Sequence, residues 1–147
     1  MDFQRDLPGG VALSDDPARL DLDVVHRYLA EESYWALGRG RAAFERAVAH
    51  SLCLGLYGPD GAQIGFARAM TDYGLRAHLV DVFVLPAWRG HGLGRALVAA
   101  MLDHPELSGV ATWTLSTRDA HGLYATFGFV PQPEPQKQMV LQRRRKD

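Results

Sequence analysis

A chain of 147 residues has the length of one ordinary domain and can bury a hydrophobic core without cross-links. Its formal net charge of −1 lacks the basic surplus typical of nucleic-acid-binding proteins, so we expect no nucleic-acid partner. No apolar run approaches the ~18 residues of a membrane span, and the first residues lack the apolar centre of a signal peptide. We therefore expect a cytoplasmic protein with no membrane partner, built as a single domain over residues 1–147.

The first half of the sequence predicts a strand, two helices and a hairpin. A short strand is expected over 11–13, and apolar residues at helical spacing predict helices over 21–32 and 41–50. Strands are expected over 51–57 and 64–71. Because Gly-Pro-Asp-Gly stands between these two strands, they should form a hairpin.

The second half alternates strands and helices. In chain order we expect a strand over 78–85 ended by Pro86, a helix over 92–103, a strand over 111–116, a short helix over 119–127 closed by Gly128, and a last strand over 139–142. A hairpin followed by strand–helix–strand–helix predicts an α/β fold with a mixed, mostly antiparallel sheet and helices on both faces.

Three glycines in five residues, Gly90, Gly92 and Gly94, separate the strand over 78–85 from the helix that follows. The first N–H groups of a helix have no partner within the helix and attract anions. Glycines let these groups approach a phosphate closely, and the flanking Arg89 and Arg95 can add charge-assisted hydrogen bonds. The segment predicts a phosphate-binding turn; the alternative is a glycine-rich turn with no ligand.

Two common phosphate-binding motifs do not fit this turn. A nucleoside-triphosphate loop requires a Gly-Lys pair, which the chain lacks, and the dinucleotide pattern G-x-G-x-x-G would need glycine where Arg95 or Leu97 stands. Arg89-x-x-Gly92-x-Gly94, placed after an apolar strand and Pro86, resembles the coenzyme A pyrophosphate loop Q/R-x-x-G-x-G/A of the GNAT superfamily of N-acetyltransferases.

A second segment carries the same resemblance. L-Y-A-T-F-G-F over 123–129 is similar to the family's L-Y-x-x-x-G-F segment, and Ala120 occupies its usual alanine position. The two motifs occur in the family's order and on the expected elements, and the resemblance covers residues 51–130. It implies an enzyme that transfers an acetyl group from acetyl-CoA to a primary amine of a small molecule or peptide by direct attack on the thioester.

The resemblance also implies roles for individual residues in holding the cofactor. Backbone groups of Val82, Phe83 and Val84 would bind the pantetheine arm, and one N–H would polarise the thioester carbonyl. The pyrophosphate would bind the turn, which consists of Arg89, Gly90, His91, Gly92, Leu93, Gly94 and Arg95. Thr117 stands where the family commonly has asparagine and is expected to contact the cofactor.

Tyr124 occupies the family's general-acid position. A tyrosine with an ordinary pKa of about 10 is protonated at neutral pH and can donate a proton to a leaving thiolate. The alternative is a half-buried tyrosine that fills the core. Tyr124 also separates the two candidate functions, because a non-catalytic acyl-CoA-binding sensor would have the turn without the acid.

Asp81 is the only acidic residue in the apolar strand over 78–85, where alternation places it on the same face as Phe83. It is the candidate base that accepts the amine's proton, directly or through water. The alternatives are a residue that binds a cationic group of the substrate, and a hydrogen-bonded structural aspartate.

Two aromatic residues, Tyr34 and Trp35, lie in the connection between the first two helices. They are candidates for the acceptor site, where they could contact an amine through cation–π interactions; the alternatives are core or homodimer-interface residues. The histidines do not have metal-ligand spacing, so no metal site is predicted. The sequence does not identify the acceptor amine or the preferred acyl group.

Overall fold

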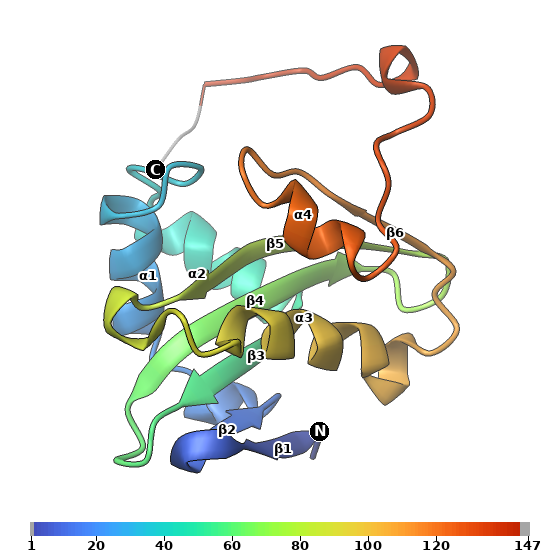
Figure 1. The fold of residues 1–147 in the computed structure, drawn as a ribbon. Helices are drawn as coiled ribbons and strands as arrows, with labels where there is room; N and C mark the ends of the chain where they lie inside the picture. Colours follow the sequence, from blue (N-terminus) through green and yellow to red (C-terminus); the bar gives the residue numbers. More distant parts are fainter. Residues whose placement is uncertain (1, 145–147) are drawn as a thin grey trace. The chain divides into compact units, whose positions relative to one another are not determined.

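The computed structural model describes residues 2–144 of the chain (Figure 1). The chain divides into two units, residues 1–116 and 117–147. The expectation of a single domain stays a prediction. None of the described helices has the length and hydrophobicity needed to cross a bilayer.

The first unit is built on a six-stranded sheet whose strands follow the chain order. The strands are β1 (Gln4–Leu7), β2 (Val11–Ser14), β3 (Leu52–Tyr57), β4 (Gln63–Thr71), β5 (Arg76–Val84) and β6 (Thr112–Leu115). All neighbouring pairs are antiparallel except β5 and β6, which are parallel. The predicted mixed, mostly antiparallel sheet is confirmed.

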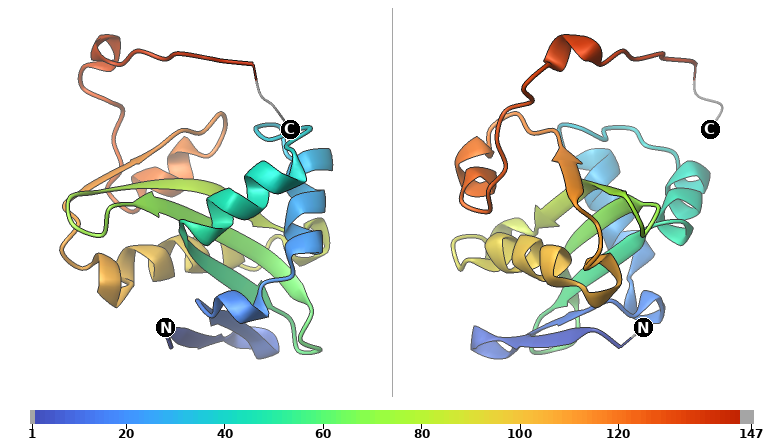
Figure 2. Two further views of the ribbon diagram at one scale, coloured as in Figure 1. Left: turned by 180° about the vertical axis from the view of Figure 1, so that it is seen from behind. Right: turned by 90° about the vertical axis from the view of Figure 1, so that its right-hand side faces the viewer.

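Helices cover both faces of this sheet (Figure 2). Helices α1 (Leu22–Glu31) and α2 (Arg41–Ala49) lie on one face, and α3 (Leu93–Asp103) lies on the other. On the α1 and α2 face, a buried cluster joins Val25, Leu29 and Phe44 of the helices to Phe66 and Phe83 of the strands. This packing explains why the apolar residues of α1 recur at helical spacing.

The structure adds a strand that the sequence pattern did not predict. β1 pairs with β2 across a turn in which Gly9 and Gly10 have φ of 80° and 76°. β1 contains Gln4, Arg5 and Asp6, so it lacks the apolar alternation of a core strand. An edge strand that is half exposed can carry such residues, and it is therefore hard to recognise from hydrophobicity.

The second unit differs from the prediction at two points. Helix α4 (His121–Ala125) is shorter than the expected 119–127, and Gly128, with φ of 97°, follows its last turn. The predicted strand over 139–142 is wrong, because these residues are irregular and Met139 is 97% exposed. A strand forms only where a neighbour supplies ladder hydrogen bonds, and apolar composition alone does not supply them.

A buried His–Asp pair fixes the end of α3 to the start of the chain. His104 Nε2 lies 2.8 Å from Asp15 Oδ2, and both side chains are fully buried. The Glu106 N–H donates to His104 Nδ1, so the ring proton lies on Nε2 and points to Asp15. The Phe3 ring packs on the imidazole with centroids 4.7 Å apart.

We expect His104→Ala to lower the free energy of unfolding by about 2 kcal/mol, because it leaves a buried carboxylate short of a hydrogen bond and opens a cavity. Urea denaturation of both proteins measures the change. His50→Ala, which removes an exposed histidine, is the matched control and should change stability by less than about 1 kcal/mol. Equal losses in the two variants would contradict the role of the pair.

Candidate active site

The end of β5 has an open edge within the first unit. β6 pairs with β5 only from Arg76 to Leu79, opposite Thr112 to Leu115. β5 continues to Val84, and among the described residues of this unit no strand pairs with that edge beyond Leu79. The two parallel strands thus share only the first half of β5.

Backbone alternation decides which groups face this edge. The Leu85 N–H donates to the Ile64 carbonyl at 2.8 Å, and Phe83 lies opposite Phe66, so the backbone groups of Phe83 face β4. Those of Val82 and Val84 face the open edge. The geometry therefore favours Val82 and Val84 over Phe83 as backbone partners for a ligand, and the predicted role of these three residues stays a prediction.

A β-bulge at Asp81 lies immediately before this edge. Asp81 has φ of 56°, which is unusual for a non-glycine residue, and the β4–β5 register shifts between Phe66 and Arg68. A bulge bends a strand and increases its twist. It therefore explains how β5 can turn away from β6 while keeping its pairing with β4.

The Asp81 carboxylate is held by three donors from two other segments. Trp35 Nε1 donates to Oδ1 at 2.8 Å, and Arg39 Nη1 and Arg68 Nε donate to Oδ2 at 2.7 and 3.0 Å. Arg68 Nη1 also donates to Ser51 Oγ at 3.0 Å. The side chain of Asp81 is almost fully buried. We call Asp81, Arg39, Arg68 and Trp35 the Asp81 cluster.

These contacts bear on the predicted base. Burial tends to raise the pKa of Asp81, but the hydrogen bond and charge of Arg39, the charge of Arg68 and the hydrogen bond from Trp35 outweigh it and lower the pKa below its ordinary value. A carboxylate with a lowered pKa is a weaker proton acceptor. The geometry favours the structural alternative for Asp81, and it brings the predicted residues Asp81 and Trp35 into direct contact.

Arg39 and Arg68 were missed by the sequence reasoning. Arg68 could have been found, because it is the one charged residue in the apolar strand over 64–71, on the partner strand of Asp81. An isolated buried cation and an isolated buried anion on paired strands indicate an ion pair. Arg39 lies in a glycine-flanked connection and gives no such signal.

The glycine turn has the geometry expected of an anion-binding turn. A 3-10 turn (Pro86–Trp88) follows β5, and Gly90 and Gly92 have φ of 84° and 75°. A Cβ added at either glycine would meet no described atom within 4 Å, so the space beside the turn is open. Gly92 is the N-cap of α3, whose first N–H groups point out of the helix.

The other residues of the turn divide into buried and exposed groups. Leu93 is buried, whereas His91 and Arg95 are exposed. Arg89 donates from Nε to the Val84 carbonyl at 3.0 Å and from Nη2 to the Tyr28 hydroxyl at 2.8 Å. Arg89 therefore anchors the turn to β5 and α1, a role that the sequence reasoning did not give it.

Two predicted site residues belong to the second unit. Tyr124 lies in α4, is half-buried, and packs edge-to-face on Phe129 with ring centroids 5.9 Å apart. Thr117 Oγ1 accepts a hydrogen bond from the Ala120 N–H at 3.0 Å, just before α4. The roles of Tyr124 and Thr117 stay predictions.

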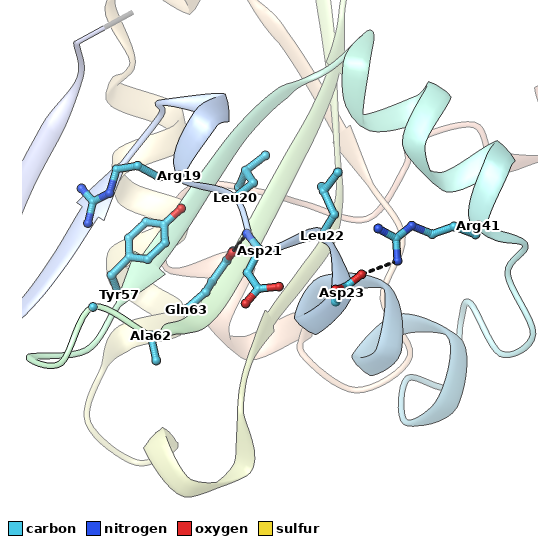
Figure 3. Close-up of a pocket in the computed structure, with 10 residues that line it drawn as sticks. Arg19, Leu20, Asp21, Leu22, Asp23, Arg41, Tyr57, Ala62 and Gln63 are labelled. Atoms are coloured by element: carbon cyan, nitrogen blue, oxygen red, sulfur yellow. Dashed lines mark hydrogen bonds and ion pairs between the residues drawn. The ribbon is translucent and has the colours of Figure 1, made fainter.

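A separate hollow of about 520 Å³ lies beside the start of α1 (Figure 3). Two contacts join polar groups of its lining, since Arg41 Nη1 lies 2.8 Å from Asp23 Oδ1 and the Asp21 N–H donates to Gln63 Oε1 at 2.7 Å. It contains none of the predicted site residues. Across residues 2–144, no group of three His, Cys, Asp or Glu side chains is arranged to hold a metal ion.

Comparison with known proteins finds a family match over the part of the chain that contains β5, the glycine turn and α4. The acetyltransferase (GNAT) domain matches residues 50–131. A crystal structure assigned to the GNAT family from Xanthomonas campestris pv. campestris superposes with a TM-score of 0.86 at 45% identity, covering 90% of this chain and 92% of that one.

Two curated relatives are also similar. A Gibberella zeae protein named as an acetyltransferase is 32% identical, with 59% of each chain covered. GCN5-related N-acetyltransferase 1 of Arabidopsis thaliana is 30% identical over 87% of this chain and 66% of its own length. The chain thus spans less than two thirds of the length of these two relatives. Because the domain match covers the β5 edge, the glycine turn and α4, this chain belongs to the GNAT acetyltransferase family.

Proposed function

We propose that the protein is an acetyl-CoA-dependent N-acetyltransferase that moves an acetyl group to a primary amine of a small molecule or peptide. The observation that carries the proposal is the continuity of two features along the chain. The open edge of β5 at Val82 and Val84 leads within a few residues to the glycine turn and the N-terminus of α3. The extended pantetheine arm of coenzyme A would bind the open edge, and its pyrophosphate would bind the glycine turn that follows.

The residues of the first unit fit coenzyme A in two ways. The Val82 N–H and C=O and the Val84 N–H on the open edge of β5 can pair with the amides of an extended pantetheine arm, as a strand would, whereas the Val84 C=O already accepts from Arg89. The N–H groups at the start of α3, with the open space beside Gly90 and Gly92, suit the pyrophosphate. Because Arg89 is used to anchor the turn, we assign most of the phosphate binding to backbone donors.

Bound acetyl-CoA would supply an activated acyl thioester. The protein's own groups would stabilise the charge that develops and transfer the protons. An N–H on the open edge of β5 would stabilise negative charge that develops on the carbonyl oxygen. Tyr124 would donate its phenolic proton to the departing thiolate. Since Asp81 is bound to three donors, we assign it to holding the bulge, and the amine's proton would leave to solvent.

The alternative is a non-catalytic acyl-CoA-binding sensor. Such a protein would use the open edge and the glycine turn without the acid. The effect of Tyr124 on turnover separates the two functions.

Changing Gly92 to valine should abolish the stabilisation of the protein by acetyl-CoA. A β-branched side chain at φ of 75° strains the N-cap of α3, and its atoms occupy the space that a phosphate would need. The measurement is the rise in Tm on adding acetyl-CoA, which grows with ligand concentration over Kd.

Gly61→Val is the matched control for backbone strain. Gly61 has φ of 87° in the β3–β4 turn, and a Cβ there also meets open space. Both variants should be destabilised alone, but only Gly61→Val should keep the acetyl-CoA-dependent rise in Tm. A full rise in Gly92→Val would refute the assignment of the turn.

A further inference from the structure

The Asp81 cluster contains more positive than negative charge. Arg39 and Arg68 both pair with Asp81, and among the described residues no second carboxylate lies within 4.0 Å of either guanidinium. Two guanidiniums and one carboxylate leave one positive charge in excess. Because a largely buried charge is costly unless it is paired, an excess positive charge at this position favours the binding of an anion.

The excess charge can be reached from outside at one end of the cluster. The side chains of Asp81 and Arg68 are 1% and 9% exposed, but that of Arg39 is 17% exposed. Trp35 is more exposed, and its ring meets Tyr34 edge-to-face with centroids 5.1 Å apart. The accessible end therefore presents a guanidinium beside two aromatic rings.

The positive field of the cluster extends beyond its own ion pairs. Burial and then the charge of Arg68 lower the pKa of His78, whose Nδ1 lies 2.7 Å from Thr114 Oγ1. His78 thus stays neutral more readily and adds no further positive charge. Cys53, which is also buried, has its pKa raised to about 12 by burial, so it supplies no thiolate to neutralise the cluster.

The cluster lies next to the proposed reaction site. Asp81 directly precedes Val82, whose backbone groups face the open edge of β5, and consecutive Cα atoms are about 3.8 Å apart. Arg39 Nη1 lies 2.7 Å from Asp81 Oδ2, so one aspartate side chain separates this guanidinium from the residue that precedes the edge. Guanidinium groups prefer carboxylates and phosphates, which they bind with two parallel hydrogen bonds.

We propose that the acceptor is a small amine that also carries an acidic group within a few bonds of the nitrogen, and that this acid binds Arg39 at the accessible end of the Asp81 cluster. The proposal rests on the N-acetyltransferase function proposed above and narrows its substrate class. It disfavours polyamines and other purely cationic acceptors, which the excess charge of the cluster would repel.

The kinetic test compares each acid-bearing amine with a close analogue that lacks the acid. The first pair, L-amino acids and their amides, tests a carboxylate. The second pair, O-phosphoethanolamine and ethanolamine, tests a phosphate. Spermidine is the purely cationic acceptor. We expect the acid-bearing member of at least one pair to have a kcat/KM at least about tenfold higher, mainly through KM. Equal or better use of the amides, ethanolamine and spermidine would overturn the proposal.

Variants of Arg39 assign the preference to this residue. Arg39→Gln should remove the preference for the acid, and Arg39→Lys should restore part of it, because the lysine keeps the charge but not the paired hydrogen bonds. Arg46→Gln removes an exposed arginine of α2 and is the matched control, which should keep the full preference. An unchanged preference in Arg39→Gln would contradict the assignment.

A binding measurement separates this proposal from the proposed function. N-acetylglycine should raise the Tm of the wild-type protein more than N-acetylglycinamide does, and Arg39→Gln should abolish the difference. If no amine releases thiol from acetyl-CoA but this difference is present, the transferase proposal fails and the acid site stands. If amines are acetylated but the two probes act equally and acids are not preferred, the function stands and the acid site is refuted.

Discussion

Replacing Asp81 by asparagine is expected to lower the free energy of unfolding by about 3–5 kcal/mol, the usual cost of removing one partner of a buried ion pair. The asparagine would keep the left-handed backbone conformation at φ of 56°, which this residue tolerates well. It would not keep the negative charge, so Arg39 and Arg68 would remain buried without a counter-charge. Urea denaturation at neutral pH measures the loss.

Asp103→Asn is the matched control, because Asp103 forms an exposed ion pair with Arg5 at 3.0 Å. Exposed pairs contribute about 0–1 kcal/mol, so this variant should lose little stability. A loss below about 1 kcal/mol in Asp81→Asn would show that the cluster does not hold the bulge.

The difference in stability between wild type and Asp81→Asn should depend on pH. The pKa of Asp81 is lowered in the folded protein, so its contribution to stability is present above the unfolded pKa of about 4 and is lost as the pH falls through the lower folded pKa. The difference between wild type and Asp81→Asn should therefore be constant at neutral pH and shrink below about pH 4. A constant difference down to pH 2 would contradict the assigned direction.

Replacing Tyr124 by phenylalanine is expected to lower kcat by about 100-fold, the usual scale for a general acid, while the affinity for acetyl-CoA changes little. The substitution removes only the hydroxyl, so the edge-to-face contact with Phe129 can remain. Steady-state kinetics and the acetyl-CoA-dependent rise in Tm measure the two effects separately.

Tyr73→Phe is the control for removing a tyrosine hydroxyl elsewhere. Tyr73 lies in the β4–β5 turn and is 44% exposed. This variant should keep wild-type kcat. If Tyr124→Phe turns over the true acceptor as fast as wild type does, Tyr124 is not the acid.

The sequence predicts the fold well where packing imposes a periodic pattern. The β3–β4 hairpin, the apolar strand β5 and the amphipathic α1 each bury a continuous apolar surface, so their residues alternate or recur visibly. β1 is an edge strand with charged residues, and 139–142 is apolar without forming a strand. In both places, the presence or absence of a neighbouring strand determines whether a strand forms, and the hydrophobicity of the segment does not predict this.

The candidate site shows the same division. Local backbone conformation, such as the positive φ of Gly90 and Gly92, can be anticipated from the spacing of the glycines in the sequence. The contact of Asp81 with Arg39 joins residues 42 positions apart, and the bulge that aims Asp81 is set by the register of β4. Such contacts depend on tertiary packing, so the sequence showed an isolated carboxylate and left its role open between base and structural residue.

The most direct test of the proposed function is release of free thiol from acetyl-CoA in the presence of a panel of amines that includes acid-bearing ones, with mass spectrometry of the products. We predict amine-dependent thiol release together with an N-acetylated product, and loss of both in Gly92→Val. A protein that acetyl-CoA stabilises but that acetylates no amine in the panel would contradict the enzymatic function and support the acyl-CoA sensor.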